Sequence, residues 1–181
     1  MDLYLTEPVG PFNTAGGAAF NTFTTKKSVD PAPLPVIPAG KLRLGSLIEV
    51  TAYGNYSTTG TPTANWGLWF GTRAGVMTGD LALSSTITTP SGAASFPWVM
   101  KWHGMVTAIG TAGTILGQGE LYQGTALTTF AVFPIPITAA LRTVAAFNTT
   151  IENAIGVNFT WGTSNAANSV TVDDSRVLIL N

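Results

Sequence analysis

The sequence contains no cysteine and only one histidine, His103. Without cysteine there is neither a disulfide framework nor thiolate chemistry. A zinc centre needs three or four His, Cys or carboxylate ligands, and this chain offers one histidine nitrogen ligand and no cysteine sulfur ligand. We therefore expect no metal site and no cofactor, although calcium held by the oxygens of Asp173 and Asp174 stays open as a minor alternative.

Charged side chains are also scarce, at 9% of the 181 residues, against about 25% in an average globular protein. A soluble monomer normally keeps its surface charged. So neutral a surface favours burial against copies of the same chain or against a partner; a surface coated with Thr and Asn is the alternative. The net charge of −1 and the scattered Lys and Arg predict no nucleic acid partner, because such binding requires a basic patch.

Long hydrophobic runs are absent although the mean hydropathy is +0.31. No stretch approaches the roughly 20 apolar residues of a membrane helix, so we expect no membrane partner. The first residues, MDLYLTEPVG, lack the basic and apolar regions of a signal peptide. This pattern predicts synthesis and folding in a cytoplasm.

No reaction centre is recognisable, so we expect the protein not to be an enzyme. His103 would have to serve any Ser/His/Asp triad, and no G-x-S-x-G elbow accompanies it. Asp173 and Asp174 are adjacent, so on a strand they would point to opposite faces and could not act as a pair. The glycines of GQGELYQG indicate a bulge or tight strand packing, since no helix follows that could hold phosphate.

Residues 1–40 read as an extended N-terminal arm, because six prolines and several glycines exclude long helices and central strands. Apolar side chains are spread through this arm, which is unusual for a disordered tail. Whether they pack on their own domain or on a neighbouring protein stays open. The candidate anchoring residues are Leu3, Tyr4, Leu5, Phe12, Phe20 and Phe23.

Residues 41–181 read as one β domain. From Ile48 to Tyr56 apolar and polar side chains alternate with the period of two of a half-buried strand. About eight such segments follow one another between turn signals, and only residues 139–147 suggest a turn of helix or a loop. The pattern predicts an all-β, jelly-roll-like β-sandwich, without fixing the order of its strands.

The five tryptophans divide into two groups. Four share a strand face with aliphatic side chains, which favours core packing; these are Trp66, Trp98, Trp102 and Trp161. Trp69 instead lies between glycines on the less apolar face of its strand. We therefore predict that Trp69, together with Tyr53, belongs to an oligomer or ligand surface.

The order of four stretches resembles a group of small structural proteins of tailed bacteriophages. These stretches are FTTKKSVDPAP, IPAGKLRLGSLIEVTAYGNYSTTGTPT, FPWVMKWHGMVTAIGTAGTILGQGEL and VDDSRVLILN. The resemblance covers roughly residues 20–181 and includes no catalytic signature. It implies a jelly-roll module with an N-terminal arm that forms trimeric head-decoration or minor capsid proteins, or modules of fibres.

These observations lead to one main hypothesis and two alternatives. In the main hypothesis the chain is a virion protein that forms a homotrimer, binds the major capsid protein and stabilises the capsid surface, with its arm as anchor. In the first alternative it is a fibre or receptor-binding module that recognises a host glycan through Tyr53 and Trp69. A β-sandwich enzyme acting on carbohydrate is the least favoured, because no carboxylate pair can be nominated.

Overall fold

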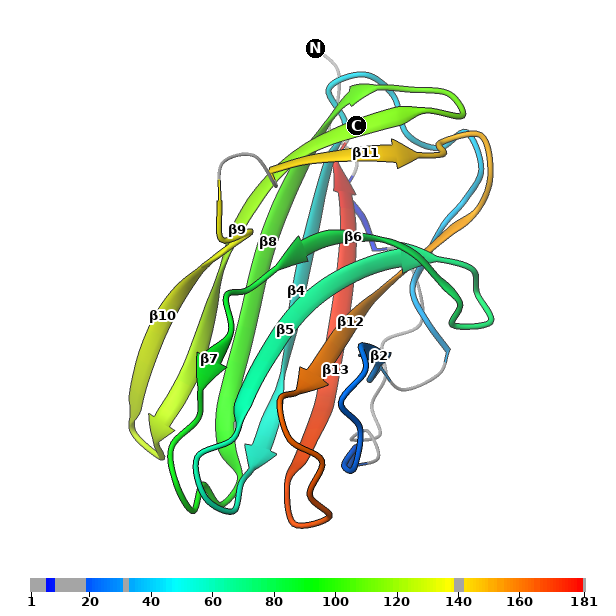
Figure 1. Ribbon diagram of the computed structural model, residues 1–181. Helices are drawn as coiled ribbons and strands as arrows, with labels where there is room; N and C mark the ends of the chain where they lie inside the picture. The colour runs from blue at the N-terminus through cyan, green and yellow to red at the C-terminus, as the bar shows by residue number, and fades with distance from the viewer. Residues whose placement is uncertain (1–5, 9–18, 31–32, 139–141, 181) are drawn as a thin grey trace.

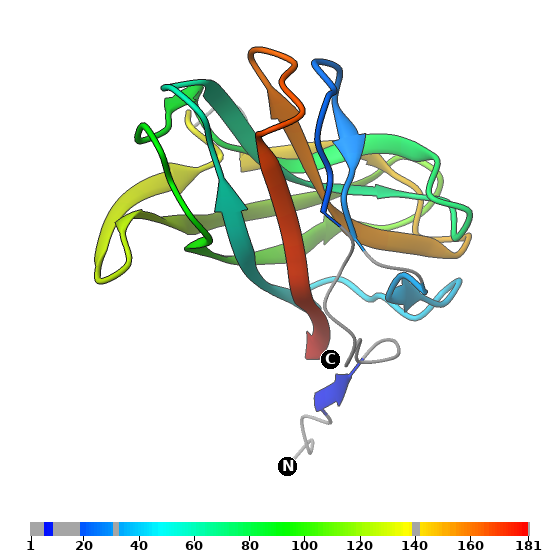
Figure 2. The same ribbon diagram turned by 90° about the horizontal axis from the view of Figure 1, so that it is seen from below.

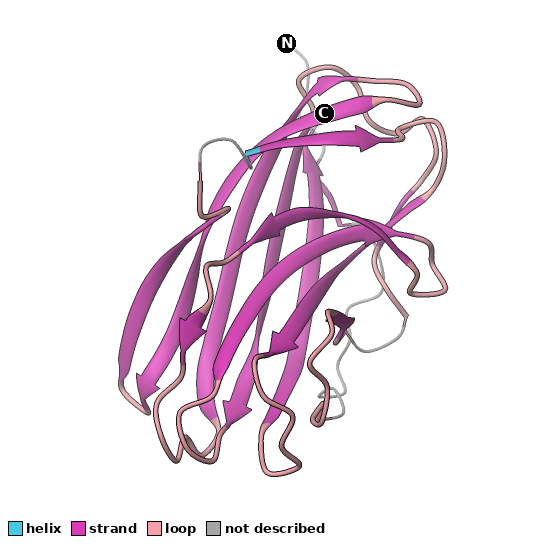
Figure 3. Ribbon diagram, viewed as in Figure 1, coloured by secondary structure: helices cyan, strands magenta, loops and turns pink. Residues whose placement is uncertain are grey.

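The computed structural model describes residues 6–8, 19–30, 33–138 and 142–180 (Figure 1). The described residues are dominated by strands, as Figure 3 shows. Among them no helix is both long and apolar enough to span a membrane. Within these ranges there are thirteen strands, nine of which have five or more residues.

Two antiparallel sheets make up the fold. Sheet A consists, in order, of β1 (Thr6–Pro8), β13 (Ser169–Leu180), β4 (Leu47–Ser57), β8 (Phe96–Ala108), β9 (Gly113–Ala126) and β10 (Thr129–Ile135), and β11 (Thr143–Phe147) also pairs with β9. Sheet B consists of β2 (Lys27–Ser28), β12 (Asn153–Trp161), β5 (Thr63–Gly71) and β6 (Met77–Leu83), with β3 (Val36–Ile37) on β12 and β7 (Ile87–Thr88) on β5. The prediction of an all-β sandwich is confirmed.

The alternation seen in the sequence separates the two faces of sheet A. On β4 the even-numbered side chains from Ile48 to Tyr56 are buried, whereas the odd-numbered ones are exposed or half-buried. β8 repeats the pattern, with Trp98, Met100 and Trp102 buried. Sheet A therefore has one face in the core and one face directed outward.

Aromatic side chains fill much of the core between the sheets. The Trp66 and Phe159 rings meet edge to face with centroids 4.8 Å apart, a favourable geometry for aromatic pairs. The Trp102 ring lies so close to Gly117 that a Cβ there would be 2.1 Å from its Cζ2 atom. The four tryptophans assigned to the core are at most 2% exposed, so that prediction is confirmed, and tight packing explains this glycine.

The described part of the N-terminal segment is built into the domain. β2 and β3 both pair with β12, and in Figure 2 β2 lies beside β12. Val29 and Ile37 belong to the main core cluster. The predicted division at residue 40 therefore does not correspond to a break in packing, because residues before it complete the edge of sheet B.

β11 corrects the expectation of a helical turn or loop over residues 139–147. Val144 pairs with Ile115 of β9, and Val144 and Phe147 are buried. Cross-strand pairing and burial outweigh the weak helix propensity of this Ala-containing stretch. Residues 139–141 lie outside the described residues.

Candidate functional site on the outer face of sheet A

The outward side chains of β4, β8 and β9 form four rows across sheet A, because the register places them opposite one another. The rows are Leu47, Met105 and Leu116; Glu49, His103 and Gln118; Thr51, Lys101 and Glu120; and Tyr53, Val99 and Tyr122. The row of Leu47, Met105 and Leu116 and the row with the two tyrosines thus lie on either side of two polar rows.

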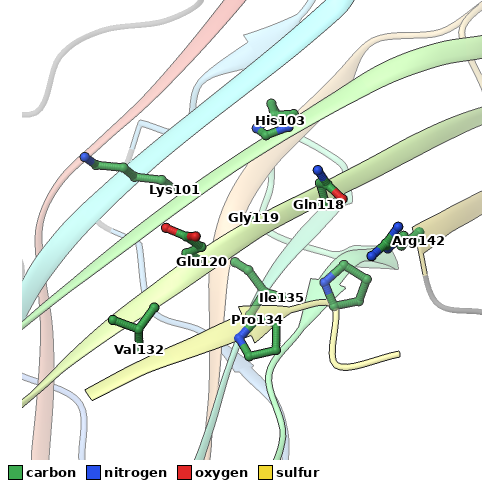
Figure 4. A pocket seen from close by; sticks show the side chains of 10 residues that line it. Lys101, His103, Gln118, Gly119, Glu120, Val132, Pro134, Ile135 and Arg142 are labelled. Carbon is green, nitrogen blue, oxygen red and sulfur yellow. The ribbon is translucent and has the colours of Figure 1, made fainter. Parts of the chain in front are cut away.

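A groove of about 570 Å³ lies where β8, β9 and β10 meet the segment that leads into β11. We call it the β8–β10 groove. Figure 4 shows Lys101 and Arg142 on opposite sides of the groove, with Glu120, His103 and Gln118 between them. Val132 and Pro134 of β10 also line the groove. The site therefore combines polar and cationic side chains with an apolar border.

Charges in this groove are unevenly paired. The Tyr122 hydroxyl donates a hydrogen bond to Glu120 Oε2, and this hydrogen bond to the carboxylate raises the pKa of Tyr122. Lys101 Nζ lies 5.9 Å from the centroid of the Tyr122 ring, within the range of a cation–π contact. Within the described ranges no carboxylate forms an ion pair with Lys101, His103 or Arg142.

A second groove of about 250 Å³ lies between β4 and β13. Tyr53 lines it together with Glu49 and Thr51. On β13, Arg176 Nε donates to Asp174 Oδ2 over 3.0 Å. This groove carries a compensated ion pair, whereas in the described chain no carboxylate forms an ion pair with the cations of the β8–β10 groove.

The two aromatic residues predicted to lie on a surface differ in their exposure. Tyr53 is 43% exposed on the outer face of sheet A, where an oligomer or ligand could reach it. Trp69 is 0% exposed, and its Nε1 donates to the Val157 carbonyl over 3.2 Å. The prediction that Trp69 lies on a surface is wrong, because Leu34 and Val36 of the N-terminal segment pack over it.

The predicted arm anchors divide similarly. Phe20 and Phe23 are half-buried and pack against the core of their own chain, with the Phe23 and Phe159 ring centroids 6.1 Å apart. Phe20 also pairs with Val170 through its backbone. Leu3, Tyr4, Leu5 and Phe12 lie outside the described residues.

Sequence reasoning missed the residues of the β8–β10 groove. Lys101 and His103 share an outward face by the period of two, and Gln118, Glu120 and Tyr122 do so on the next strand. The alternation in the sequence could therefore have identified these outward side chains. Arg142 carries no such signal, since only the pairing of β11 with β9 brings it to the groove.

Metal ligation finds no support in the described ranges, where no group of three or more His, Asp or Glu side chains could hold an ion. The β-bulge that interrupts the pairing of β13 with β4 falls at Asp173, between Val172 and Asp174. Asn55 Nδ2 donates to Asp173 Oδ2 over 3.3 Å, whereas Asp174 pairs with Arg176. Both aspartates thus have protein partners.

Comparison with known proteins gives one structural likeness. No family model matches this chain, and no curated protein does. The chain is similar to a solved structure described as the CBM2 module of the evolved Dit of Lactobacillus casei BL23 phage J-1. The TM-score is 0.41 with 10% identity over 95% of this chain and 80% of that one. A likeness of this degree establishes no common function.

Proposed function

We propose that this chain is a non-enzymatic structural protein of a tailed-phage virion, which self-associates through the edge of sheet A at β10 and binds the outside of the capsid. The observation that carries the proposal is the composition of this edge. β10, TFAVFPI, contains no charged residue, and Phe130 and Val132 are 45% and 53% exposed. Monomeric proteins protect long edge strands with charges, prolines or bulges. β10 has Pro134 and an irregular register at its start, between Thr129 and Phe130, but no charge, and its exposed apolar side chains favour an interface.

Other exposed apolar side chains support assembly. Leu127, in the turn before β10, is 68% exposed. Across β4, β8 and β9, the adjacent Leu47, Met105 and Leu116 are 37%, 40% and 46% exposed. Contiguous apolar patches of this kind mark interaction sites. The resemblance to phage decoration proteins supplies both the homotrimer and the major capsid protein as partner.

The oligomeric state tests the edge directly. Light scattering during size-exclusion chromatography should give about 56 kDa, three times the 18.8 kDa of one chain. The trimer should persist in about 1 M NaCl, because an apolar interface is not screened by salt. Val132→Lys should yield monomers. Val76→Lys is the matched control, since Val76 is 62% exposed in the loop before β6; a monomeric wild type, or equal effects of the two variants, would refute the β10 interface.

Location in the particle tests the capsid part of the proposal. Gold-labelled antibody to this chain, viewed by electron microscopy of intact virions, should label the head at many regular positions. Labelling confined to the tail tip or to projecting fibres would refute decoration. Such a result would support the second candidate function instead.

The second candidate is a fibre or receptor-binding module that recognises a host glycan. It is favoured by the exposed Tyr53 ring beside the β4–β13 groove, since aromatic rings can stack on sugar rings. Tyr53→Ala should abolish binding on a glycan array if this ring is the platform. Unchanged binding by the variant would exclude Tyr53 from recognition.

A further inference from the structure

We propose that the β8–β10 groove binds an acidic saccharide that carries carboxylates on successive sugar units. The proposal concerns a different groove from the one beside Tyr53. It rests on the second candidate function only in assigning a glycan ligand, and it shares Val132 of β10 with the surface proposed for self-association.

The first argument is charge. The whole chain has eight Lys and Arg, and two of them, Lys101 and Arg142, line this one groove with His103. Among the described residues that line the groove, Glu120 supplies the one carboxylate, and one of its oxygens accepts a hydrogen bond from the Tyr122 hydroxyl. The groove therefore has a net positive charge, which is complementary to an anion.

The second argument is the placement of the cations. Lys101 comes from β8, and Arg142 comes from the segment that leads into β11. The two side chains lie on opposite sides of the groove in Figure 4. A ligand with a single anionic group would contact one of them, whereas an extended ligand with repeated carboxylates would contact both. Arginine is well suited to such a ligand because its guanidinium can bind a carboxylate through two parallel hydrogen bonds.

The third argument separates a saccharide from a peptide. β8 pairs with β4 and β9, and β9 pairs with β8 and β10. The backbone groups of β8 and β9 beneath the groove are thus engaged in the sheet and cannot pair with an added peptide strand. Recognition is left to side chains, namely the amide of Gln118, the ring nitrogens of His103 and the apolar surfaces of Val132 and Pro134. Scattered hydrogen-bonding groups beside apolar surface suit the hydroxyls and C–H faces of a sugar.

Isothermal titration calorimetry with trigalacturonate tests the proposal, with maltotriose as the neutral trisaccharide and monomeric galacturonate as the short acid. We expect trigalacturonate to bind at least about tenfold more tightly than either, because only it combines several carboxylates with the length of the groove. Its affinity should fall as salt rises from about 0.05 to 0.5 M, since the contacts are charged and exposed. Equal affinity for maltotriose would overturn the acidic assignment.

Three variants localise the binding. Lys101→Gln and Arg142→Gln should each weaken trigalacturonate binding by about five- to tenfold, because each removes one charge-assisted contact. Arg43→Gln removes the same charge from an exposed position outside the groove and should leave the affinity unchanged. Circular dichroism would confirm that all three are folded. Equal effects of the three substitutions would overturn the site.

Two further ligands test the chemical class. A short poly-glutamate peptide offers carboxylates without sugar rings, and a glycerol-phosphate oligomer offers phosphates in their place. Both should bind more weakly than trigalacturonate. Tighter binding of the peptide would overturn the saccharide assignment, and tighter binding of the phosphate oligomer would overturn the carboxylate assignment.

Discussion

The two outward faces of the sandwich differ in what lies over them. On sheet B, Trp69 points outward from β5, yet it is 0% exposed because the N-terminal segment packs on it. On sheet A, Tyr53 points outward from β4 and is 43% exposed. Both are aromatic residues on the outward side of a long strand. Their burial is decided by a distant segment of the chain, and not by the strand that carries them.

The same contrast extends to charge. Asp30 lies beside Gly156 of sheet B, where its Oδ2 accepts a hydrogen bond from the Val157 amide. On sheet A, Lys101 and Glu120 are exposed. The part of the outer face of sheet B around Trp69 and Asp30 thus belongs to the folded interior, whereas the outer face of sheet A is available to ligands and partners. Five substitutions test this contrast.

Trp69→Ala should have the largest effect. Removing a fully buried tryptophan should lower the free energy of unfolding by about 3–5 kcal/mol. Tyr53→Ala, at the exposed counterpart, should change it by less than about 1 kcal/mol. Urea denaturation of both variants gives the comparison. Similar losses would show that the two faces are equally covered in solution.

Asp30→Asn should change the pH dependence of stability. Burial raises the pKa of Asp30 from 3.8 to about 7, although the hydrogen bond from Val157 opposes the shift. Between these two pKa values the folded protein holds a proton that the unfolded chain releases, so stability falls as pH rises through this window. A shift of this size corresponds to a loss of about 2–4 kcal/mol between pH 4 and pH 8.

The asparagine variant cannot ionise, and its amide oxygen can still accept from Val157. Its free energy of unfolding should therefore decline less over the same interval. Urea denaturation at a series of pH values measures the difference between the two proteins. Parallel curves would mean that Asp30 does not titrate in a buried setting.

Gly156→Ala should have an intermediate effect. A Cβ at this position would lie 2.5 Å from Asp30 Oδ2 and 2.7 Å from Trp69 Nε1, so the N-terminal segment or the indole must shift. Overpacking of this kind costs about 1–3 kcal/mol. Thermal unfolding of the variant should show a lower midpoint. An unchanged midpoint would indicate that the segment is not held tightly against β12.

Tyr122→Phe should have the smallest effect. It removes the hydroxyl that donates to Glu120, an exposed pair on the open face, and surface changes of this kind stay within about 0.5 kcal/mol. Urea denaturation should therefore give nearly superimposable curves. A loss above about 1 kcal/mol would mean that the outer face of sheet A is covered in the isolated protein.

A strand could be predicted where its own sequence shows the alternation of apolar and polar residues. The alternation from Ile48 to Tyr56 identified β4 and its buried face, because a sheet with one face in the core imposes a period of two. Pro134 fits the edge position of β10, where a missing amide donor is tolerated. β11 was missed because its strand character comes from pairing with β9 and not from its own composition.

The candidate site was predictable only in part, for the same reason. Tyr53 is exposed, as the alternation of β4 indicates, while its part in an oligomer or ligand surface stays a prediction. Trp69 was wrongly predicted to be exposed, because no local sequence pattern indicates that residues near Leu34 pack over it. Arg142 reaches the β8–β10 groove through the fold alone. Contacts between distant segments are what the local pattern does not contain.

The contrast between the two faces is tested most directly by hydroxyl-radical footprinting of the full-length protein, read residue by residue by mass spectrometry. Tyr53 and Met105 on the outer face of sheet A should be oxidised at low radical dose, while Trp69 should stay unmodified despite its reactive indole. Oxidation of Trp69 as fast as that of Tyr53 would contradict the account, because sheet B would then be open as well.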